Sequence, residues 1–259
     1  MNNRITDLFK RKKKNILSVF YTAGFPDLDS TAPIAKYLDE AGADMIEIGI
    51  PFSDPVADGP TIQESNKIAL GNGMNLHFLI DQVKEIRKQK INIPLILMGY
   101  LNPVMQYGVE KFIKDAAKAG VDGLILPDMP LYEYEEDYKA MFESENLCNT
   151  FLISPTTSEE RIRRIDAATH GFVYAVSASS TTGAKGLFKD DQINYFDRLQ
   201  KMKLNNPYLI GFGISNSETF LKASEYSAGA IVGSAFINLL KTSKDHEKDI
   251  HEFVKGIKG

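Results

Sequence analysis

"MIEIGIPFSDPVADGP", residues 45–60, places a carboxylate inside an apolar run. Ile46, Ile48 and Ile50 alternate with other residues, as on a β-strand that turns one face to a hydrophobic core. Glu47 then points to the opposite face, and the chain runs at once into a loop of Pro, Asp and Gly. Burying an unpaired polar group costs roughly 2–7 kcal/mol. The surroundings of Glu47 therefore decide how this stretch is interpreted.

β-rich runs of this kind recur along the chain, each followed by a polar or Gly/Pro loop and a segment of helix length. In "YGVEKFIKDAAKAG", residues 107–120, the apolar residues have helical spacing. In "EAGAD" and "KAGVD" a glycine stands where a helix should end before the next strand. The predicted strands cover residues 16–22, 45–50, 94–100, 123–127, 149–154, 172–177, 208–213 and 230–234.

Eight such β-then-α units in about 250 residues predict a (β/α)8 TIM barrel. No linker or low-complexity stretch interrupts the series, so residues 1–259 are expected to form a single barrel domain. The first residues, "MNNRITDLF", predict a short amphipathic N-terminal helix. A doubly wound open sheet is the alternative architecture.

The composition is that of an ordinary globular protein, with 43% hydrophobic and 25% charged residues among 259. The net charge of −4 argues against nucleic acid as a partner. "KRKKK", residues 10–14, is interpreted as a solvated helix face, with a nucleic-acid or membrane patch as the alternative. Cys148 is the only cysteine, which excludes an intramolecular disulfide and a CxxC motif. No membrane-spanning run or secretory signal is visible, so we expect a cytoplasmic protein.

In a barrel, strand side chains alternate between the helix layer and the barrel interior. The three isoleucines should face the helices, and Glu47 should face the interior near the C-terminal mouth, where barrel enzymes carry their chemistry. A buried Lys or Arg would make Glu47 structural, but none lies in the eight predicted strands. We therefore expect an acid–base group whose pKa is raised by apolar surroundings. Asp58 follows in the next loop and can reach toward Glu47, although Asp before Gly is also common in turns.

The last two predicted strands end in "GFGIS" and "VGSAF". Loops at these positions, together with the start of a helix, form the usual phosphate site of barrel enzymes. Glycine lets backbone N–H groups approach an anion, and the helix start favours negative charge. Gly213, Gly233 and Ser234 are the expected donors, and "TTG" at residues 181–183 offers another. We expect the substrate to be a small phosphate ester.

These motifs resemble those of a known family. "IEIGIPFSDPVADGPTIQ" is similar to the signature of the tryptophan synthase alpha chains, and "FYTAGFPD", "LMGYLNPV", "GLILPDMP", "FLISPTT", "FVYAVS", "GFGIS" and "IVGSAF" follow in the family's order. The resemblance implies a lyase that splits indole-3-glycerol phosphate into indole and glyceraldehyde 3-phosphate by retro-aldol chemistry. It also implies a beta-chain partner that carries pyridoxal phosphate, in an assembly of two alpha and two beta chains. The alpha chain itself would use no cofactor and no metal.

The resemblance also implies roles for single residues. Glu47 matches the acid–base residue, and Asp58 matches the carboxylate that binds the indole N–H and stabilises positive charge developing on the ring. Tyr174 matches a tyrosine that lines the pocket. The matched phosphate site comprises Gly183, Gly213, Gly233 and Ser234, with Thr182 beside them. The indole slot would be formed by residues that also suit plain barrel core, namely Phe20, Tyr100, Leu126 and Phe212.

The loops after the second, third and fourth predicted strands are rich in proline and apolar residues, which favours a protein-facing surface over simple turns. With the resemblance, the rim facing the beta chain would comprise Pro51, Asp54, Asn102, Met105 and Pro130.

One segment departs from the family pattern. In "SASSTTGAKG", residues 177–186, Ser180 and Thr181 replace the usual Gly and Val, which changes the loop that acts as the family's lid.

Three other functions are considered. A sugar-phosphate isomerase or epimerase could use the same fold but would need other catalytic groups. A stand-alone indole-3-glycerol phosphate lyase would lack the beta chain. A non-catalytic subunit would only activate the beta chain, and the intact Glu47 and Asp58 argue against it.

Overall fold

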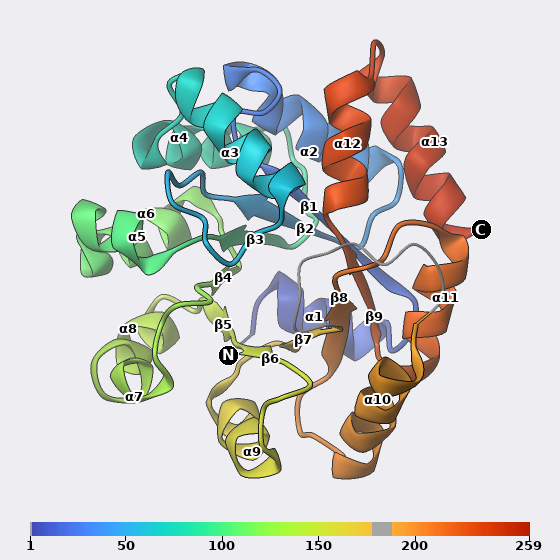
Figure 1. The fold of residues 1–259 in the computed structure, drawn as a ribbon. Coiled ribbons are helices and arrows are strands. Elements are labelled where there is room, and N and C mark those ends of the chain that lie inside the picture. Colours follow the sequence, from blue (N-terminus) through green and yellow to red (C-terminus); the bar gives the residue numbers. More distant parts are fainter. Residues whose placement is uncertain (1, 178–187) are drawn as a thin grey trace.

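The structure is a computed structural model that describes residues 2–177 and 188–259. Within these ranges nine parallel strands form one sheet in the order β5-β4-β3-β2-β1-β9-β8-β7-β6. The two ends of this order, β5 and β6, are separated in the chain only by Phe151, so the sheet curves into a nearly closed barrel (Figure 1). The strands are β1 Ile16–Thr22, β2 Met45–Gly49, β3 Leu95–Met98, β4 Gly123–Ile125, β5 Cys148–Thr150, β6 Leu152–Ile153, β7 Val173–Val176, β8 Tyr208–Gly211 and β9 Gly229–Val232.

Helices surround this barrel (Figure 1). They are α1 Arg4–Arg11, α2 Thr31–Glu40, α3 Pro60–Gly71, α4 Leu76–Lys88, α5 Leu101–Tyr107, α6 Val109–Ala119, α7 Leu131–Glu133, α8 Lys139–Ser144, α9 Glu159–Ala168, α10 Asp190–Met202, α11 Ser217–Tyr226, α12 Ser234–Thr242 and α13 His246–Lys258, with short turns η1 Leu28–Ser30 and η2 Tyr134–Tyr138. The predicted TIM barrel with an N-terminal helix is confirmed. The doubly wound alternative is wrong, because each strand pairs with its sequence neighbour and β1 also pairs with β9.

One predicted strand is divided. Residues 149–154 form β5, which pairs with β4, and β6, which pairs with β7. Between them the side chain of Phe151 packs against Tyr134, with 5.2 Å between the ring centroids. Strand pairing therefore passes from β4 to β7 at Phe151, and eight predicted strands correspond to nine observed ones.

The strand side chains alternate between two hydrophobic cores, as predicted. Ile46, Ile48 and Ile50 belong to the large core between the strands and the helices. Met45 of the same strand belongs to a smaller core inside the barrel, with Ile96 of β3 and other strand residues. Glu47 lies two residues from Met45 and so shares the interior side.

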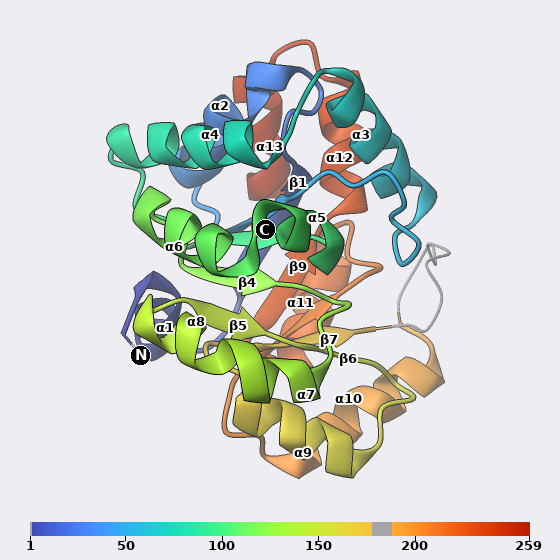
Figure 2. The ribbon, with the colours of Figure 1, turned by 90° about the vertical axis from the view of Figure 1, so that its left-hand side faces the viewer.

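The helix α1 closes one end of the barrel. Its buried residues Ile5, Leu8 and Phe9 belong to the interior core. Asn3 caps α1 and donates from Nδ2 to the carbonyl oxygen of Asp122 at 2.8 Å, which fixes the helix to the strand ends. Figure 2 shows α1 at one end of the barrel and the loop between β2 and α3 at the other. Access for a ligand is therefore from the end that carries this loop.

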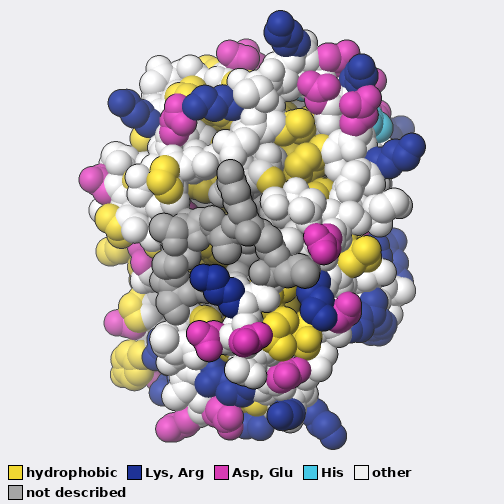
Figure 3. Space-filling model, turned by 45° about the vertical axis from the view of Figure 1, so that its right-hand side comes forward, with side chains coloured by type: hydrophobic (Ala, Val, Ile, Leu, Met, Phe, Trp, Pro, Cys, Tyr) yellow, Lys and Arg dark blue, Asp and Glu magenta, His cyan; other side chains and the backbone are white. Residues whose placement is uncertain are grey.

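The cationic run at residues 10–14 is engaged with the chain's own surface. Lys12 pairs with Asp44 at 2.7 Å, and Lys14 donates to the carbonyl oxygen of Ser224 at 3.0 Å. Figure 3 shows acidic and basic side chains interspersed over one face of the molecule. The helix α1 ends at Arg11, so Lys12 and Lys14 lie beyond the helix face on which the run was predicted. In the two described ranges, every helix is too short or too polar to cross a membrane.

Candidate active site

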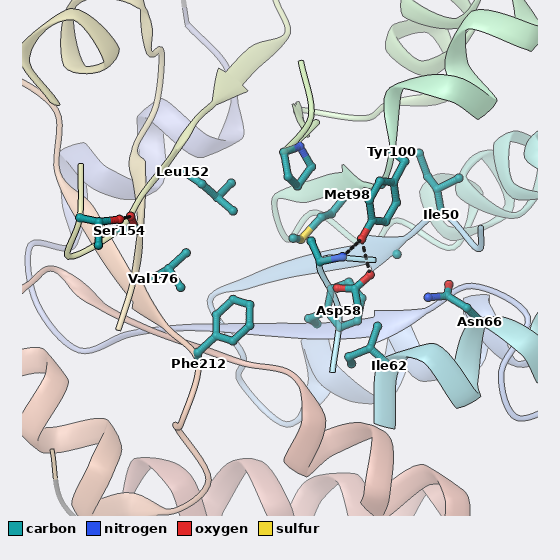
Figure 4. Close-up of a pocket in the computed structure, with 16 residues that line it drawn as sticks. Ile50, Asp58, Ile62, Asn66, Met98, Tyr100, Leu152, Ser154, Val176 and Phe212 are labelled. Atoms are coloured by element: carbon teal, nitrogen blue, oxygen red, sulfur yellow. Dashed lines mark hydrogen bonds between the residues drawn. The ribbon is translucent and has the colours of Figure 1, made fainter. Parts of the chain in front are cut away.

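A pocket of about 300 Å³ lies at the C-terminal ends of the strands. Its walls are mostly apolar, and Figure 4 shows Met98, Leu152, Val176 and Phe212 around it. Phe20 completes the apolar wall, and polar groups such as Asp58 are few. The volume is at the lower end of the range for small-molecule sites. The predicted indole-slot residues Phe20, Tyr100 and Phe212 all line this pocket.

Glu47 lies within β2 and has no exposed surface. Its Oε1 accepts a hydrogen bond of 2.7 Å from the hydroxyl of Ser18, which is also fully buried. Its Oε2 has no hydrogen-bond partner among the described residues. Burial raises the pKa of Glu47 to about 7, and the Ser18 hydrogen bond opposes this rise. Among the described residues, no Lys, Arg or His side chain forms an ion pair with this carboxylate.

Glu47 does not itself line the pocket, although its neighbours do. Phe20, which lies beside Glu47 in the β1–β2 register, and Gly49, two residues further along β2, are both lining residues. A Cβ atom on Gly49 would lie 2.6 Å from Cζ of Phe20, so this glycine makes room for the ring. The carboxylate of Glu47 therefore lies next to the pocket but outside its lining.

Asp58 lies in the loop between β2 and α3. Its Oδ2 accepts a hydrogen bond of 3.1 Å from the hydroxyl of Tyr100, and the same hydroxyl oxygen accepts the N–H of Ala57 at 3.0 Å (Figure 4). The ring of Tyr100 also packs against Phe52, with 5.1 Å between centroids. Burial raises the pKa of Asp58, and the Tyr100 hydrogen bond opposes it. One tyrosine thus fixes this loop and its carboxylate at the pocket.

Tyr174 of β7 lies within electrostatic range of both carboxylates. It is only 5% exposed, and its ring meets Phe212 edge-on with 6.3 Å between centroids. A Cβ atom at Gly211 would lie 2.2 Å from the hydroxyl of Tyr174, so the glycine leaves space for it. The pKa of Tyr174 is raised well above its usual value, first by burial and then by the charges of Glu47 and Asp58. The three groups therefore share one electrostatic environment.

The predicted phosphate donors lie at the ends of β8 and β9, beside the pocket rather than in its lining. Gly213 is exposed and has a φ of 76°. Gly233 precedes α12, and Ser234 is its exposed first residue. The pocket residue Phe20 would lie 3.6 Å from a Cβ atom on Gly233. Thr182 and Gly183, with the departing residues Ser180 and Thr181, lie outside the described residues.

Two predicted residues lie elsewhere. Leu126 is 2% exposed and belongs to the core between strands and helices, whereas the next residue, Pro127, lines the pocket. Pro51, predicted on the partner-facing rim, is buried.

The other rim residues are exposed: Asp54, Asn102, Met105 and Pro130. Two more exposed apolar residues lie in the same segments: Val56 in the loop after β2 is 86% exposed, and Tyr132 in α7 is 66% exposed. Both residues lie in the proline-rich segments quoted from the sequence, so their apolar side chains could have been added to the predicted rim from the sequence alone.

Ser18 is a site residue that the sequence analysis did not single out, and the polar lining residues Asn66, Ser154 and Thr156 are others. Ser18 lies between Leu17 and Val19, which face the helix layer, so strand alternation places it in the barrel interior. The argument used for Glu47 would have identified it. Among the residues that the structure describes, no group of three or more His, Cys, Asp or Glu side chains could hold a metal ion.

The family model of the tryptophan synthase alpha chain matches residues 7–257. The chain belongs to the tryptophan synthase alpha chain family. It is 52% identical to the alpha chain of Parabacteroides distasonis over 99% of both chains, and 52% identical to that of Flavobacterium psychrophilum over 98% of this chain and 99% of the relative. A crystal structure of tryptophan synthase subunit alpha from Legionella pneumophila superposes with a TM-score of 0.89 at 33% identity, covering 100% of this chain and 98% of that one.

Membership in the tryptophan synthase alpha chain family defines the reaction. The chain is a lyase that cleaves indole-3-glycerol phosphate in tryptophan biosynthesis, and it pairs with the tryptophan synthase beta chain. Solved tryptophan synthase from Mycobacterium tuberculosis superposes on the whole of this chain with a TM-score of 0.89 at 29% identity. The isomerase or epimerase alternative is wrong.

Proposed function

We propose that Glu47 is the acid–base residue of this cleavage and that Asp58 stabilises the charge that develops on the indole ring. The observation that carries the proposal is a fully buried carboxylate, Glu47, next to an apolar pocket that is lined by the half-buried carboxylate of Asp58. Burial raises the pKa of both groups, and both act on the pKa of Tyr174. The indole ring is proposed to bind between Phe20 and Phe212, which both line this pocket.

The reaction breaks the bond between C3 of the indole and the first carbon of the glycerol chain. With a pKa of about 7, Glu47 carries a proton in about half of the molecules at neutral pH and can give it to C3. Positive charge then spreads to the indole nitrogen, where ionised Asp58 accepts the N–H hydrogen bond. The carboxylate of Glu47 next takes the proton of the hydroxyl on that first carbon. The carbon–carbon bond breaks as an aldehyde forms, its electron pair returns to the ring, and Glu47 is again protonated.

The phosphate is proposed to bind the backbone N–H groups of Gly213, Gly233 and Ser234 at the start of α12, where the helix dipole favours an anion. Thr182 and Gly183 are included on the resemblance alone. Pyridoxal phosphate is assigned to the beta chain on the same ground, and no cofactor or metal is proposed for this chain.

The partner-facing rim is proposed to comprise Asp54, Asn102, Met105 and Pro130, extended by Val56 and Tyr132. Its support is the exposure of large apolar side chains around the mouth of the barrel, which favours burial against another protein. We propose an assembly of two alpha and two beta chains in which residues 1–259 act as one barrel domain. A cytoplasmic location is proposed because a phosphate ester is ionised at neutral pH and stays in the compartment where it is made.

The test is indole release from indole-3-glycerol phosphate by isolated variants. Glu47→Gln keeps the side-chain shape and should lower kcat by roughly 10²–10⁴-fold, the usual contribution of a general acid–base group. Asp58→Asn should lower kcat by roughly 10²-fold or more, as for other groups that stabilise charge in the transition state. Glu64→Gln is the matched control, because Glu64 is exposed and pairs with Lys241 at 2.7 Å. Activity of Glu47→Gln within a few-fold of the control would remove Glu47 from the mechanism.

A further inference from the structure

Ser18 holds Glu47 on the side away from the pocket. In the β1–β2 register, Phe20 lies beside Glu47, and Ser18 lies beside Met45. Phe20 lines the pocket, whereas Met45 belongs to the core that α1 closes from the other end. Ser18 is therefore one residue layer deeper in the barrel than Glu47. Its 2.7 Å hydrogen bond draws the carboxylate down, which explains why Glu47 is absent from the pocket lining.

Few other groups in the barrel interior could form a hydrogen bond with Glu47 in place of Ser18. Its neighbours in the strand register are Phe20 on β1 and Ile96 on β3, both apolar. The titratable groups that share the space are Tyr174 on β7, Asp58 above the pocket floor, and Cys148 on β5 near α1. The Ser18 hydroxyl is the hydrogen-bond donor that Glu47 has among the described residues.

A hydroxyl that donates to a carboxylate stabilises the ionised form more than the neutral acid, because hydrogen bonds to charged groups are roughly twice as strong. We propose that Ser18 is a positioning residue for the cleavage: its hydroxyl holds ionised Glu47 below the pocket and releases the side chain when Glu47 is protonated. The inference rests on the proposed role of Glu47.

This arrangement couples the charge of Glu47 to its position. The protonated acid, held weakly, rotates toward the pocket, which its neighbours Phe20 and Gly49 already line. The acid is thus presented to C3 of the indole in the form that can give a proton. In the free enzyme the ionised form stays in the barrel interior; once the proton has passed to C3, the substrate hydroxyl takes the place of the Ser18 hydroxyl as the donor to the carboxylate and then gives up its proton.

The variants that test this are Ser18→Thr and Ser18→Val, which have nearly the same shape and differ in the hydroxyl. Ser18→Ala removes the hydroxyl without adding volume and serves if the larger side chains prevent folding. The pKa of Glu47 is measured in each purified chain by carbon-13 NMR of labelled glutamate carboxyl groups. Its resonance is assigned by its absence in Glu47→Gln. This titration does not depend on activity.

We expect Ser18→Thr to titrate like wild type, and Ser18→Val and Ser18→Ala to titrate about one pH unit higher, the size expected from one hydrogen bond to a charged group. The limb of the kcat/KM profile that belongs to Glu47 should move by the same amount, since this parameter reports the free enzyme.

Equal pKa values in the Thr and Val variants, or in wild type and Ser18→Ala, would overturn the role of Ser18. Unchanged pH–rate profiles alongside an inactive Glu47→Gln would overturn it too, and would leave the proposed function in place. Full activity of Glu47→Gln would overturn the proposed function, and the role of Ser18 in the reaction with it.

Discussion

Glu47→Gln is expected to stabilise the folded chain at neutral and alkaline pH while it removes activity. The carboxyl group is fully buried, and its pKa is raised from 4.5 to about 7, chiefly by desolvation. In the unfolded chain the group is solvated and ionises near its ordinary pKa. Folding therefore disfavours the ionised form, which the catalytic cycle nevertheless requires.

The magnitude follows from the difference between the two pKa values, about 2.5 units from 4.5 to 7. At 1.36 kcal/mol per unit this is roughly 3 kcal/mol of unfolding free energy. Below the unfolded pKa, both states are protonated and the full stability is present. As the pH rises toward the folded pKa of about 7, the unfolded state releases its proton first, so the unfolding free energy falls. Above that pH the loss is complete. Glutamine does not titrate, so the unfolding free energy of Glu47→Gln does not fall over this pH range.

The assay is urea unfolding of isolated wild type, Glu47→Gln and the control Glu64→Gln between about pH 4 and about pH 9. The measured quantity is the difference in total unfolding free energy from wild type at each pH. For Glu47→Gln this difference should shift by roughly 3 kcal/mol in favour of the variant as the pH rises. Glu64→Gln should follow wild type. A difference for Glu47→Gln that stays constant with pH would refute the buried, raised-pKa description of Glu47.

Two further predictions concern the phosphate and the partner. Gly233→Val should raise KM for indole-3-glycerol phosphate at least tenfold with little change in kcat, since a side chain there blocks the anion; an unchanged KM would place the phosphate elsewhere. Gly213→Val is the less clean variant, because the φ of 76° strains any β-branched residue. A cognate beta chain should raise indole release at least tenfold, about 1.4 kcal/mol at the transition state. Asp54→Ala should lose most of that stimulation and keep the slow isolated activity; full stimulation would exclude the Asp54 loop as the route.

Much of this architecture could be predicted because strand alternation is a local property. The pattern of Ile46, Glu47 and Ile48 was enough to place the isoleucines against the helices and Glu47 inside the barrel. Asp58 was expected near Glu47 because it lies in the loop that follows the same strand, whereas Phe20 and Phe212 were placed in the pocket by the family resemblance; all three line it.

What could not be predicted depends on where strands end and on side-chain rotation. The strand β4 is only three residues long, so the alternation does not decide whether Leu126 or Pro127 faces the pocket, and the structure selects Pro127. The division of the predicted strand at Phe151 depends on pairing with β4 on one side and β7 on the other, which the segment's own sequence does not specify. The rotation of Glu47 toward Ser18 depends on a side-chain torsion that no sequence pattern reports.

The two carboxylates show how one chemical group can be given two tasks by its depth in the barrel. Burial raises the pKa of each carboxylate. Each also accepts a hydrogen bond from one hydroxyl, that of Ser18 for Glu47 and that of Tyr100 for Asp58, and this hydrogen bond opposes the rise. Glu47 lies in a strand with no exposed surface, so its pKa reaches about 7 and it can exchange a proton near neutral pH. Asp58 lies in a loop and keeps partial contact with solvent. Solvent and the Tyr100 hydroxyl both stabilise its ionised form, the form that can stabilise a positive charge on the indole ring. Depth therefore suits the strand carboxylate to proton transfer and the loop carboxylate to charge stabilisation.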